Sequence, residues 1–349
     1  MRGPSETFPL AEASIRSALA STPAEDPVRI RELLAKARGM KGLADEDLPP
    51  LMALRDPRLL LELFDTAKWV KDQIYGNRIV MFAPLYVSNL CGNECLYCAF
   101  RASNRELPRR ALNQEEIAAE VGHLLAQGHK RLVLVAGEAY PKEGLDYILS
   151  AIRTVYAVRH GDENIRRVNV NIAPLEVADF RRLKETEIGT YQLFQETYHR
   201  ETYARMHPRG PKADFDWRLG CMDRAMQAGI DDVGIGALFG LYDWRFELLA
   251  LLHHARHLEA RFGCGPHTIS VPRIEPAAGS GTSEAPPFAV SDADFHKLIA
   301  ILRLAVPYTG LILSTRERPE VRRDALQLGI SQISAGSRTN PGGYEEDAL

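Results

Sequence analysis

The sequence has few cysteines, no excess of charge of one sign and no long apolar run at its start. Only five of its 349 residues are Cys, and 43 Lys and Arg stand against 46 Asp and Glu. The first twenty residues carry Glu6 and Glu12 and predict neither a signal peptide nor a membrane span. These absences argue against a disulfide framework and against a protein dominated by nucleic-acid phosphate contacts. We expect a reducing, cytoplasmic compartment, with no nucleic-acid or membrane partner.

The composition and length are those of an ordinary globular protein. Hydrophobic residues make up 45% and charged residues 26% of the chain, which excludes collagen-like, coiled-coil and wholly disordered classes. The length fits two domains or one α/β barrel. No strand-like alternation precedes residue 79, and the segment 57–76 has apolar residues at helical spacing. We predict an N-terminal helical extension over residues 1–80 and a barrel over residues 81–349.

From residue 81 onward, short strand-like segments alternate with long helical segments, several of which end at Gly. Eight strands with seven intervening helices predict a TIM-type (β/α)8 barrel, and a doubly wound open sheet is the alternative. In such a barrel the functional residues lie where each strand ends and its loop begins. The predicted strands are residues 81–89, 130–138, 168–174, 190–198, 231–241, 267–276, 310–317 and 331–339.

Three of the five cysteines lie within eight residues, directly after the first predicted strand. Cys91, Cys95 and Cys98 have the spacing Cys-x3-Cys-x2-Cys. Three thiolates on one short loop can hold three corners of a cubane iron–sulfur cluster, and soft thiolate ligands suit such clusters or zinc. A structural zinc site is normally closed by four protein ligands, but no fourth Cys is near. Three ligands leave one iron open to a small molecule, so the loop predicts chemistry at an iron–sulfur cluster.

This cysteine loop resembles that of the radical S-adenosylmethionine (SAM) enzymes, whose motif is Cys-x3-Cys-x-aromatic-Cys. Tyr97 takes the aromatic position. The resemblance implies one [4Fe–4S] cluster held by Cys91, Cys95 and Cys98, with SAM bound to the open iron. It also implies that an electron from a reductant such as ferredoxin or flavodoxin leads to cleavage of SAM into methionine and a 5′-deoxyadenosyl radical.

Two further strand ends resemble the segments that bind the methionyl part of SAM in these enzymes. The segment Ala136-Gly137-Glu138 is similar to a Gly-Gly-Glu motif that receives the amino group, with Ala in place of the first Gly. Glu196 and Arg218 match a Glu and an Arg that also engage the methionyl part. An Arg suits a carboxylate because its guanidinium offers two parallel hydrogen bonds. A helix-surface ion pair of Arg218 with Asp214 or Asp216 is the alternative interpretation.

The fifth predicted strand contains Gly234-Ile235-Gly236, which resembles a Gly-x-Ile-x-Gly segment beside the adenine of SAM. By itself this pattern is weak, because Gly in a barrel strand can simply relieve crowding. Together with the segments above, it implies a SAM site that is built from several strand ends.

Longer segments resemble the tyrosine lyases among the radical SAM enzymes. The similarity runs from about residue 86 to residue 344 and includes GHKRLVLVAGE and LYDWRFE. Two members are known by role: the maturase that makes the CO and cyanide ligands of [FeFe]-hydrogenase, which is the more similar, and 2-iminoacetate synthase of thiamine biosynthesis. The resemblance implies that the radical abstracts hydrogen from the amino group of L-tyrosine. Cleavage of the Cα–Cβ bond then gives p-cresol and dehydroglycine (2-iminoacetate).

Candidate substrate contacts lie at the ends of the last two strands. Arg316 follows the seventh strand and is predicted to bind the tyrosine carboxylate, although a solvated charged loop is the alternative. Ser334 and Ser337, on the eighth strand, are predicted to add hydroxyl contacts.

The sequence departs from the hydrogenase maturase near its end. No Cys follows Cys264, so it lacks the second cysteine set that holds an auxiliary cluster, and no eighth helix is predicted after the last strand. The sequence is then either a fragment of a longer maturase, which would supply CO and cyanide synthesis alongside other hydrogenase maturation proteins, or a short lyase that releases dehydroglycine. A lyase for another aromatic amino acid and a non-catalytic iron–sulfur or zinc scaffold are the alternative functions.

Overall fold

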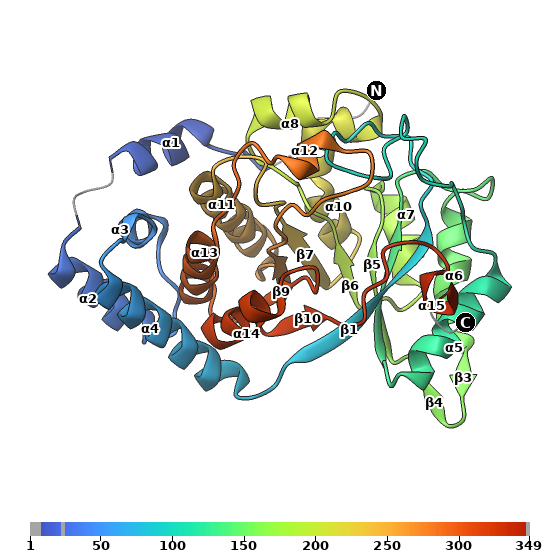
Figure 1. The fold of residues 1–349 in the computed structure, drawn as a ribbon, viewed down its shortest axis with the longest axis horizontal. Coiled ribbons are helices and arrows are strands. Elements are labelled where there is room, and N and C mark those ends of the chain that lie inside the picture. The colour runs from blue at the N-terminus through green and yellow to red at the C-terminus, as the bar shows by residue number, and fades with distance from the viewer. Residues whose placement is uncertain (1–7, 22–24, 347–349) are drawn as a thin grey trace.

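The computed structural model describes residues 8–21 and 25–346, and Figure 1 shows a strand barrel surrounded by helices, with further helices at one side. The N-terminal helices are α1 (Glu12–Ala20), α2 (Pro27–Ala37), the 3-10 helix η1 (Asp45–Asp47), α3 (Leu48–Ala53) and α4 (Pro57–Tyr75). Asp26 and Asp56 accept hydrogen bonds from backbone N–H groups in the first turns of α2 and α4. A proline occupies the first position of each of these two helices, where its missing N–H costs nothing.

Eight parallel strands form a closed barrel in the order β1, β2, β5, β6, β7, β8, β9 and β10, which confirms the predicted fold. The strands are β1 (Val80–Ser88), β2 (Arg131–Ala136), β5 (Arg167–Asn171), β6 (Thr190–Gln192), β7 (Asp232–Gly236), β8 (Thr268–Ser270), β9 (Gly310–Leu313) and β10 (Gln332–Ser334). β1 has its predicted length, and the other seven strands are shorter than predicted. In these seven the chain leaves the sheet earlier to form the loop at the end that carries the predicted site. A small antiparallel hairpin, β3 (Arg159–His160) with β4 (Glu163–Asn164), was not predicted.

Helices cover the outside of the barrel. They are α5 (Gln114–Ala126), α6 (Leu145–Ala157), α7 (Val177–Lys184), α8 (Arg200–Met206), α9 (Phe215–Leu219), α10 (Cys221–Gln227), α11 (Trp244–Phe262), α12 (Gly281–Glu284), α13 (Asp292–Ala305), α14 (Pro319–Leu328) and α15 (Gly343–Glu346). Helices α9 and α10 follow one another directly and are separated at Gly220. Among the described residues, no helix is long and apolar enough to cross a membrane.

Alternate residues of each strand face opposite sides of the barrel wall. Ala83, Leu85 and Val87 of β1 belong to the main apolar core under the helices, whereas Phe82 joins a separate buried cluster with Val133 and Ile312. The period of two in a strand places Phe82 on the opposite face from Ala83. The barrel interior is therefore closed by apolar side chains below the strand ends, as in other barrels of this type.

After β10 the described residues form one short helix. This helix, α15, packs on α5, and the backbone N–H groups of Tyr344 and Glu345 donate to the buried carboxylate of Glu120 at 3.2 and 2.7 Å. The Tyr344 hydroxyl donates to the carbonyl of Pro84 at 2.7 Å. On the outside of β1, Met81 stays 60% exposed.

The N-terminal helices pack directly on the barrel helices. Helix α4 lies against α13 and α14, and α1 lies against α11, as Figure 1 also shows on its left side. This packing brings residues from the start of the chain close to loops that follow the strands.

Candidate metal and cofactor site

The loop after β1 presents the three predicted ligands together. Cys95 is buried, and Cys91 and Cys98 are partly exposed. The backbone N–H of Cys98 donates to the carbonyl of Cys95 at 3.0 Å, and the N–H of Phe100 donates to the Cys98 sulfur at 3.4 Å. Backbone N–H groups aimed at cysteine sulfur are one of the means by which a protein tunes an iron–sulfur cluster.

The donor set fits a cubane cluster. Among the described residues, no three Cys, His, Asp or Glu side chains converge as the ligands of a single metal ion do. In a cubane each thiolate binds a different iron, so three ligands of one cluster need not converge on one point. Cys91, Cys95 and Cys98 are therefore the residues that would hold a [4Fe–4S] cluster.

A second loop fixes the cysteine loop in place. The Asn93 side chain accepts the backbone N–H of Lys212 at 2.9 Å and donates to Glu138 at 2.8 Å. The backbone N–H of Glu94 donates to the carbonyl of Arg209 at 3.0 Å. Gly210 makes this approach feasible, because a Cβ at its position would lie 2.5 Å from the Asn93 side chain.

Two carboxylates and two cations meet beside the cysteine loop and form what we call the charge cluster: Glu138, Glu196, Lys212 and Arg218. Arg218 donates to Glu138 at 2.8 Å and lies 3.5 Å from Glu196. Lys212 donates to Glu196 at 2.7 Å. The Arg218 side chain is only 3% exposed. Its Nε–H group donates to the carbonyl of Phe194 at 2.7 Å. Arg218 thus joins the ends of β2 and β6 from α9.

The opposite charges of the cluster favour the ionised forms of Glu138, which is partly buried, and of Lys212, which is buried. Burial alone would raise the pKa of Glu138, but Arg218 and Lys212 hold that pKa below its usual value. Burial and the nearby Arg218 act to lower the pKa of Lys212, but Glu196 raises it well above the usual value for lysine. Two opposite charge pairs in a dry site are a suitable binding surface for the ammonium and carboxylate groups of an amino acid.

The predicted alternative for Arg218 does not describe its position. Asp216 pairs with Arg200 on the surface at 2.7 Å, and Asp214 caps α9 by accepting from the N–H of Trp217. Arg218 instead points inward to the charge cluster.

Tyr97 fills the aromatic position of the motif and is anchored by a neutral histidine. Burial, with Lys212 nearby, lowers the pKa of His207 to about 2. His207 Nδ1–H donates to the carbonyl of Tyr203 at 2.8 Å, so its Nε2 accepts from the Tyr97 hydroxyl at 2.8 Å. These two hydrogen bonds connect the middle of the cysteine loop to the end of α8.

Gly137 is the member of the Ala136-Gly137-Glu138 segment that the cysteine loop requires. A Cβ at Gly137 would lie 2.2 Å from the backbone oxygen of Leu90, the residue directly before Cys91. The Gly137 N–H also donates to the carbonyl of Ser88 at 2.9 Å. The departure from the Gly-Gly-Glu motif thus falls on the neighbouring position, Ala136, where the structure already accommodates a Cβ.

We predict that Gly137→Ala weakens cluster binding roughly tenfold or more, as changes in the outer shell of metal sites do. The new Cβ must push Leu90, and with it Cys91, out of place. Iron content after anaerobic reconstitution measures the effect. Ala136→Gly is the matched control and should retain wild-type iron. Equal iron in all three proteins would show that the loop adjusts without cost.

Gly234 and Gly236 lie on the inner side of β7. A Cβ at Gly236 would lie 2.7 Å from the Phe194 ring, and one at Gly234 would lie 2.5 Å from the Thr268 hydroxyl. Both glycines therefore relieve crowding from neighbouring side chains, and their role beside adenine stays a prediction.

The three predicted substrate residues lie near one another, but with different surroundings. Arg316 is exposed, and its backbone N–H donates to the Ser314 hydroxyl at 3.2 Å. Ser334 accepts the N–H of Thr315 at 3.2 Å, and Ser337 accepts the Thr315 hydroxyl at 2.7 Å. The two serines thus hold the turn that carries Arg316.

Sequence reasoning missed Lys212 and Asn93. Lys212 lies in the segment between α8 and α9. Asn93 lies between the predicted ligands Cys91 and Cys95, but the motif itself specifies only the cysteines and the aromatic residue. The signal for Asn93 was its place inside the motif. No local pattern marked Lys212, because its partners Glu196 and Asn93 are 16 and 119 positions away in the sequence.

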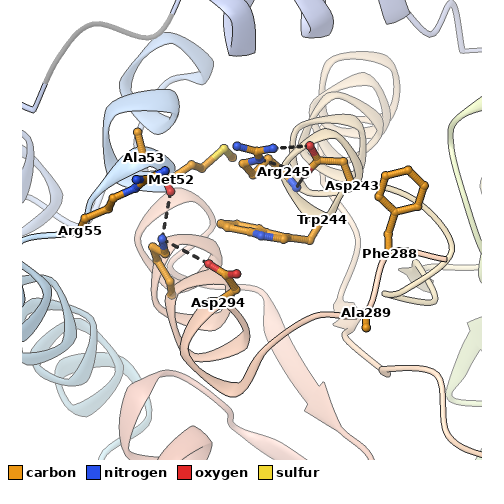
Figure 2. Close-up of a pocket in the computed structure, with 10 residues that line it drawn as sticks. Met52, Ala53, Arg55, Asp243, Trp244, Arg245, Phe288, Ala289 and Asp294 are labelled. Carbon is orange, nitrogen blue, oxygen red and sulfur yellow. Dashed lines mark hydrogen bonds and ion pairs between the residues drawn. The ribbon is translucent and has the colours of Figure 1, made fainter. Parts of the chain in front are cut away.

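A cavity of about 570 Å³ lies away from this site, between α3, α11 and α13. Figure 2 shows Trp244 and Asp294 on one side and Met52 and Arg55 of the N-terminal helices on the other. None of the predicted site residues lines it.

A closed parallel barrel with three cysteines on its first loop and a charge cluster at the neighbouring strand ends defines a radical SAM enzyme. The family model of the radical SAM superfamily matches residues 85–252, and that of the biotin and thiamin synthesis associated domain matches residues 270–348. 2-Iminoacetate synthase of Escherichia coli (strain K12) is 35% identical over 313 residues, which cover 89% of this chain and 80% of that protein.

Two solved structures of a hydrogenase maturase are also similar. The crystal structure of HydG, a maturase of the [FeFe]-hydrogenase, has a TM-score of 0.94 and 51% identity, and the match covers 97% of this chain and 74% of that one. HydG from Carboxydothermus hydrogenoformans has a TM-score of 0.88 and 44% identity, covering 95% and 76%. The chain therefore belongs to the radical SAM superfamily and, within it, to the family that contains HydG and 2-iminoacetate synthase. This membership implies a [4Fe–4S] cluster and SAM.

Proposed function

We propose that the chain is a radical SAM lyase that cleaves the Cα–Cβ bond of L-tyrosine to p-cresol and dehydroglycine. The observation that carries this proposal is the 51% identity to HydG over nearly the whole chain, with the cysteine loop and the charge cluster at the strand ends. 2-Iminoacetate synthase is named for the second product.

The chain's own residues would hold the two cofactors in adjacent places. Cys91, Cys95 and Cys98 hold the cluster. Glu138 binds the methionyl ammonium of SAM, Glu196 and Arg218 complete that end of the site, and Gly234 and Gly236 lie beside the adenine. When bound, the cluster and SAM would supply the chemistry for radical hydrogen abstraction, which we propose occurs at the tyrosine amino group. His207, at the end of α8, holds Tyr97 and with it the cysteine loop at this end of the barrel.

Arg316 is the proposed partner of the tyrosine carboxylate. Its guanidinium acts to lower the pKa of Tyr86 against the stronger effect of burial, which raises it, so Arg316 reaches toward the inner end of β1. Glu317, the next residue, is only 3% exposed and accepts from Arg273 at 2.9 Å. This ion pair and the hydroxyls of Ser334 and Ser337 fix the turn, so that Arg316 is presented in one place.

The reconstituted protein, incubated anaerobically with SAM, a low-potential reductant and tyrosine, is expected to form 5′-deoxyadenosine together with p-cresol. Chromatography of both products measures the reaction. Arg316→Ala should raise the KM for tyrosine by a larger factor than it lowers the rate of 5′-deoxyadenosine formation measured without tyrosine. Formation of 5′-deoxyadenosine without p-cresol would contradict the tyrosine assignment, and the same assay with tryptophan tests another aromatic substrate.

The use made of dehydroglycine is a separate proposal. The similarity to HydG favours hydrogenase maturation, with a ferredoxin- or flavodoxin-type reductant and other maturation proteins as partners. The similarity to 2-iminoacetate synthase favours a thiamine-pathway lyase. Both share the cleavage step, and the experiment above tests that step alone.

A further inference from the structure

Glu196 has an unusual backbone for a residue with a side chain. Its φ is +70°, in the left-handed region that is unfavourable for residues other than Gly. Such a conformation is energetically unfavourable and persists only where the surroundings impose it. The strand β6 ends at Gln192, but Glu196 still forms an isolated parallel bridge with Ala237, directly after β7. A further contact holds the chain directly after Glu196.

That contact is Glu247, a fully buried carboxyl in the first turn of α11. It accepts the hydroxyl of Thr197, and its second oxygen accepts the backbone N–H of Tyr198 at 2.8 Å. Thr197 and Tyr198 are the two residues that follow Glu196, and both are completely buried. On the other side, the Glu196 carbonyl accepts the N–H of Leu238 at 2.8 Å. Glu196 is thus held between β7 and α11.

The turn that carries Glu247 is itself fixed. Asp243 caps α11 by accepting the N–H of Arg245 at 3.0 Å, and Trp244 packs against the Lys297 ammonium, 5.7 Å from its ring centre. Lys297 donates to the carbonyls of Met52 and Leu54 of the N-terminal helices at 3.1 and 3.2 Å. Figure 2 shows Met52, Trp244 and Asp294 grouped around this contact. The N-terminal helices therefore support the first turn of α11.

The same segment is held from its outer side. The Tyr198 hydroxyl contacts His254 Nδ1 at 2.9 Å, and the Phe8 ring stacks on His254 with centres 5.1 Å apart. Burial lowers the pKa of His254 to about 3, so the ring is neutral at ordinary pH.

We infer that Glu247 is a positioning residue for SAM, which acts by holding Glu196 in the left-handed conformation that aims its carboxylate at Lys212 and Arg218. This inference rests on Glu196 being a SAM contact, as proposed above. It does not depend on tyrosine being the substrate. Burial raises the pKa of Glu247 to about 8, against the effect of its hydrogen bonds, so a neutral amide is a close substitute at pH 7.

Glu247→Leu and Glu247→Gln separate positioning from simple packing. In Glu247→Leu the Tyr198 N–H and the Thr197 hydroxyl lose their acceptor, so Glu196 is released. We expect the dissociation constant of SAM to rise roughly ten- to a hundredfold, since a displacement of about 1 Å has effects of that size. In Glu247→Gln the amide oxygen accepts the Tyr198 N–H and the NH2 group donates to Thr197, so the affinity should stay within about threefold. Equilibrium dialysis with SAM and reconstituted protein, without tyrosine, measures both.

Glu120 provides the matched control, because it is also a buried glutamate that accepts two backbone N–H groups, those of Tyr344 and Glu345. Glu120→Leu should lower the melting temperature by a similar amount and leave SAM affinity and iron content unchanged. Thr197→Val, which removes one donor only, should give an intermediate loss. Wild-type SAM affinity in Glu247→Leu, or an equal loss in Glu120→Leu, would overturn the positioning role.

Discussion

Replacing Cys95 by Ala is expected to abolish cluster assembly and 5′-deoxyadenosine formation. Cys95 is 5% exposed and lies between the other two ligands in the sequence, so its replacement leaves only Cys91 and Cys98 in the loop. Two thiolates cannot hold three corners of a cubane. We expect activity to fall by more than about a hundredfold, beyond the losses usual for outer-shell residues. Iron and sulfide analysis, with visible absorption of the reconstituted protein, measures the result.

Cys264→Ala is the control for this experiment. Cys264 is exposed and follows α11, outside the site. It should retain wild-type iron and activity, as should a protein in which only this thiol is alkylated. Full iron content in the Cys95 variant would contradict the ligand assignment, and bound zinc in the wild type would favour the scaffold function.

The second large effect is expected from Arg218→Met. Arg218 is the only contact that joins Glu138 to Glu196 within the described charge cluster, and its side chain is 3% exposed. Removing one partner of a buried ion pair leaves an unpaired charge and costs about 3–5 kcal/mol. Chemical denaturation should show this loss in the free energy of unfolding. SAM binding should fall below detection, because the cation opposite its carboxylate is gone.

The same variant should change how stability depends on pH. In the folded protein Arg218 and Lys212 hold the pKa of Glu138 below its ordinary value of 4.5. A lowered carboxyl pKa contributes stability at pH values above 4.5, and this contribution is lost as the pH falls through the folded value. The wild type should therefore lose stability below about pH 4.5. Arg218→Met should lose less stability over that range, because the part of this contribution that comes from Arg218 is already absent.

Arg224→Met is the matched control for Arg218. Arg224 is also buried, lies one helix further on and donates to the carbonyls of Leu175 and Trp217 at 3.0 and 2.7 Å. Its loss should destabilise the protein without changing SAM affinity or the acid limb of the stability profile. An acid limb in Arg218→Met identical to that of the wild type would show that Glu138 does not depend on this cation.

The sequence predicted the barrel because its signals are local. Each strand is a short apolar segment bounded by helix stops and polar ends, and residues such as Ala83, Leu85 and Val87 alternate with a period of two over a few positions. The cysteine ligands were found for the same reason, since Cys91, Cys95 and Cys98 share one short loop. Strand lengths were overestimated where the chain turns away from the sheet, as at Glu196.

The assembled site was only partly visible in the sequence. Glu138, Glu196 and Arg218 each match a separate segment of the radical SAM enzymes. The sequence leaves open whether Arg218 pairs on the helix surface or turns inward. The structure settles that position, because the ends of β2 and β6 and the start of α9 meet only once the barrel closes. The sequence predicts hydroxyl contacts to the substrate from Ser334 and Ser337. Their hydrogen bonds with Thr315 are visible only in the structure.

The sequence by itself determined the (β/α)8 barrel and the three thiolates, because spacing within a short segment encodes them, whereas the carboxylates at the strand ends were implied by the resemblance to radical SAM enzymes. Only the tertiary structure decided that Lys212 completes the charge cluster and that Glu247 holds the segment after Glu196. These contacts join residues 16 and 51 positions away from Glu196, respectively, across separate loops. A buried charge or hydrogen-bond acceptor is fixed by what surrounds it in space, and no local pattern records those neighbours.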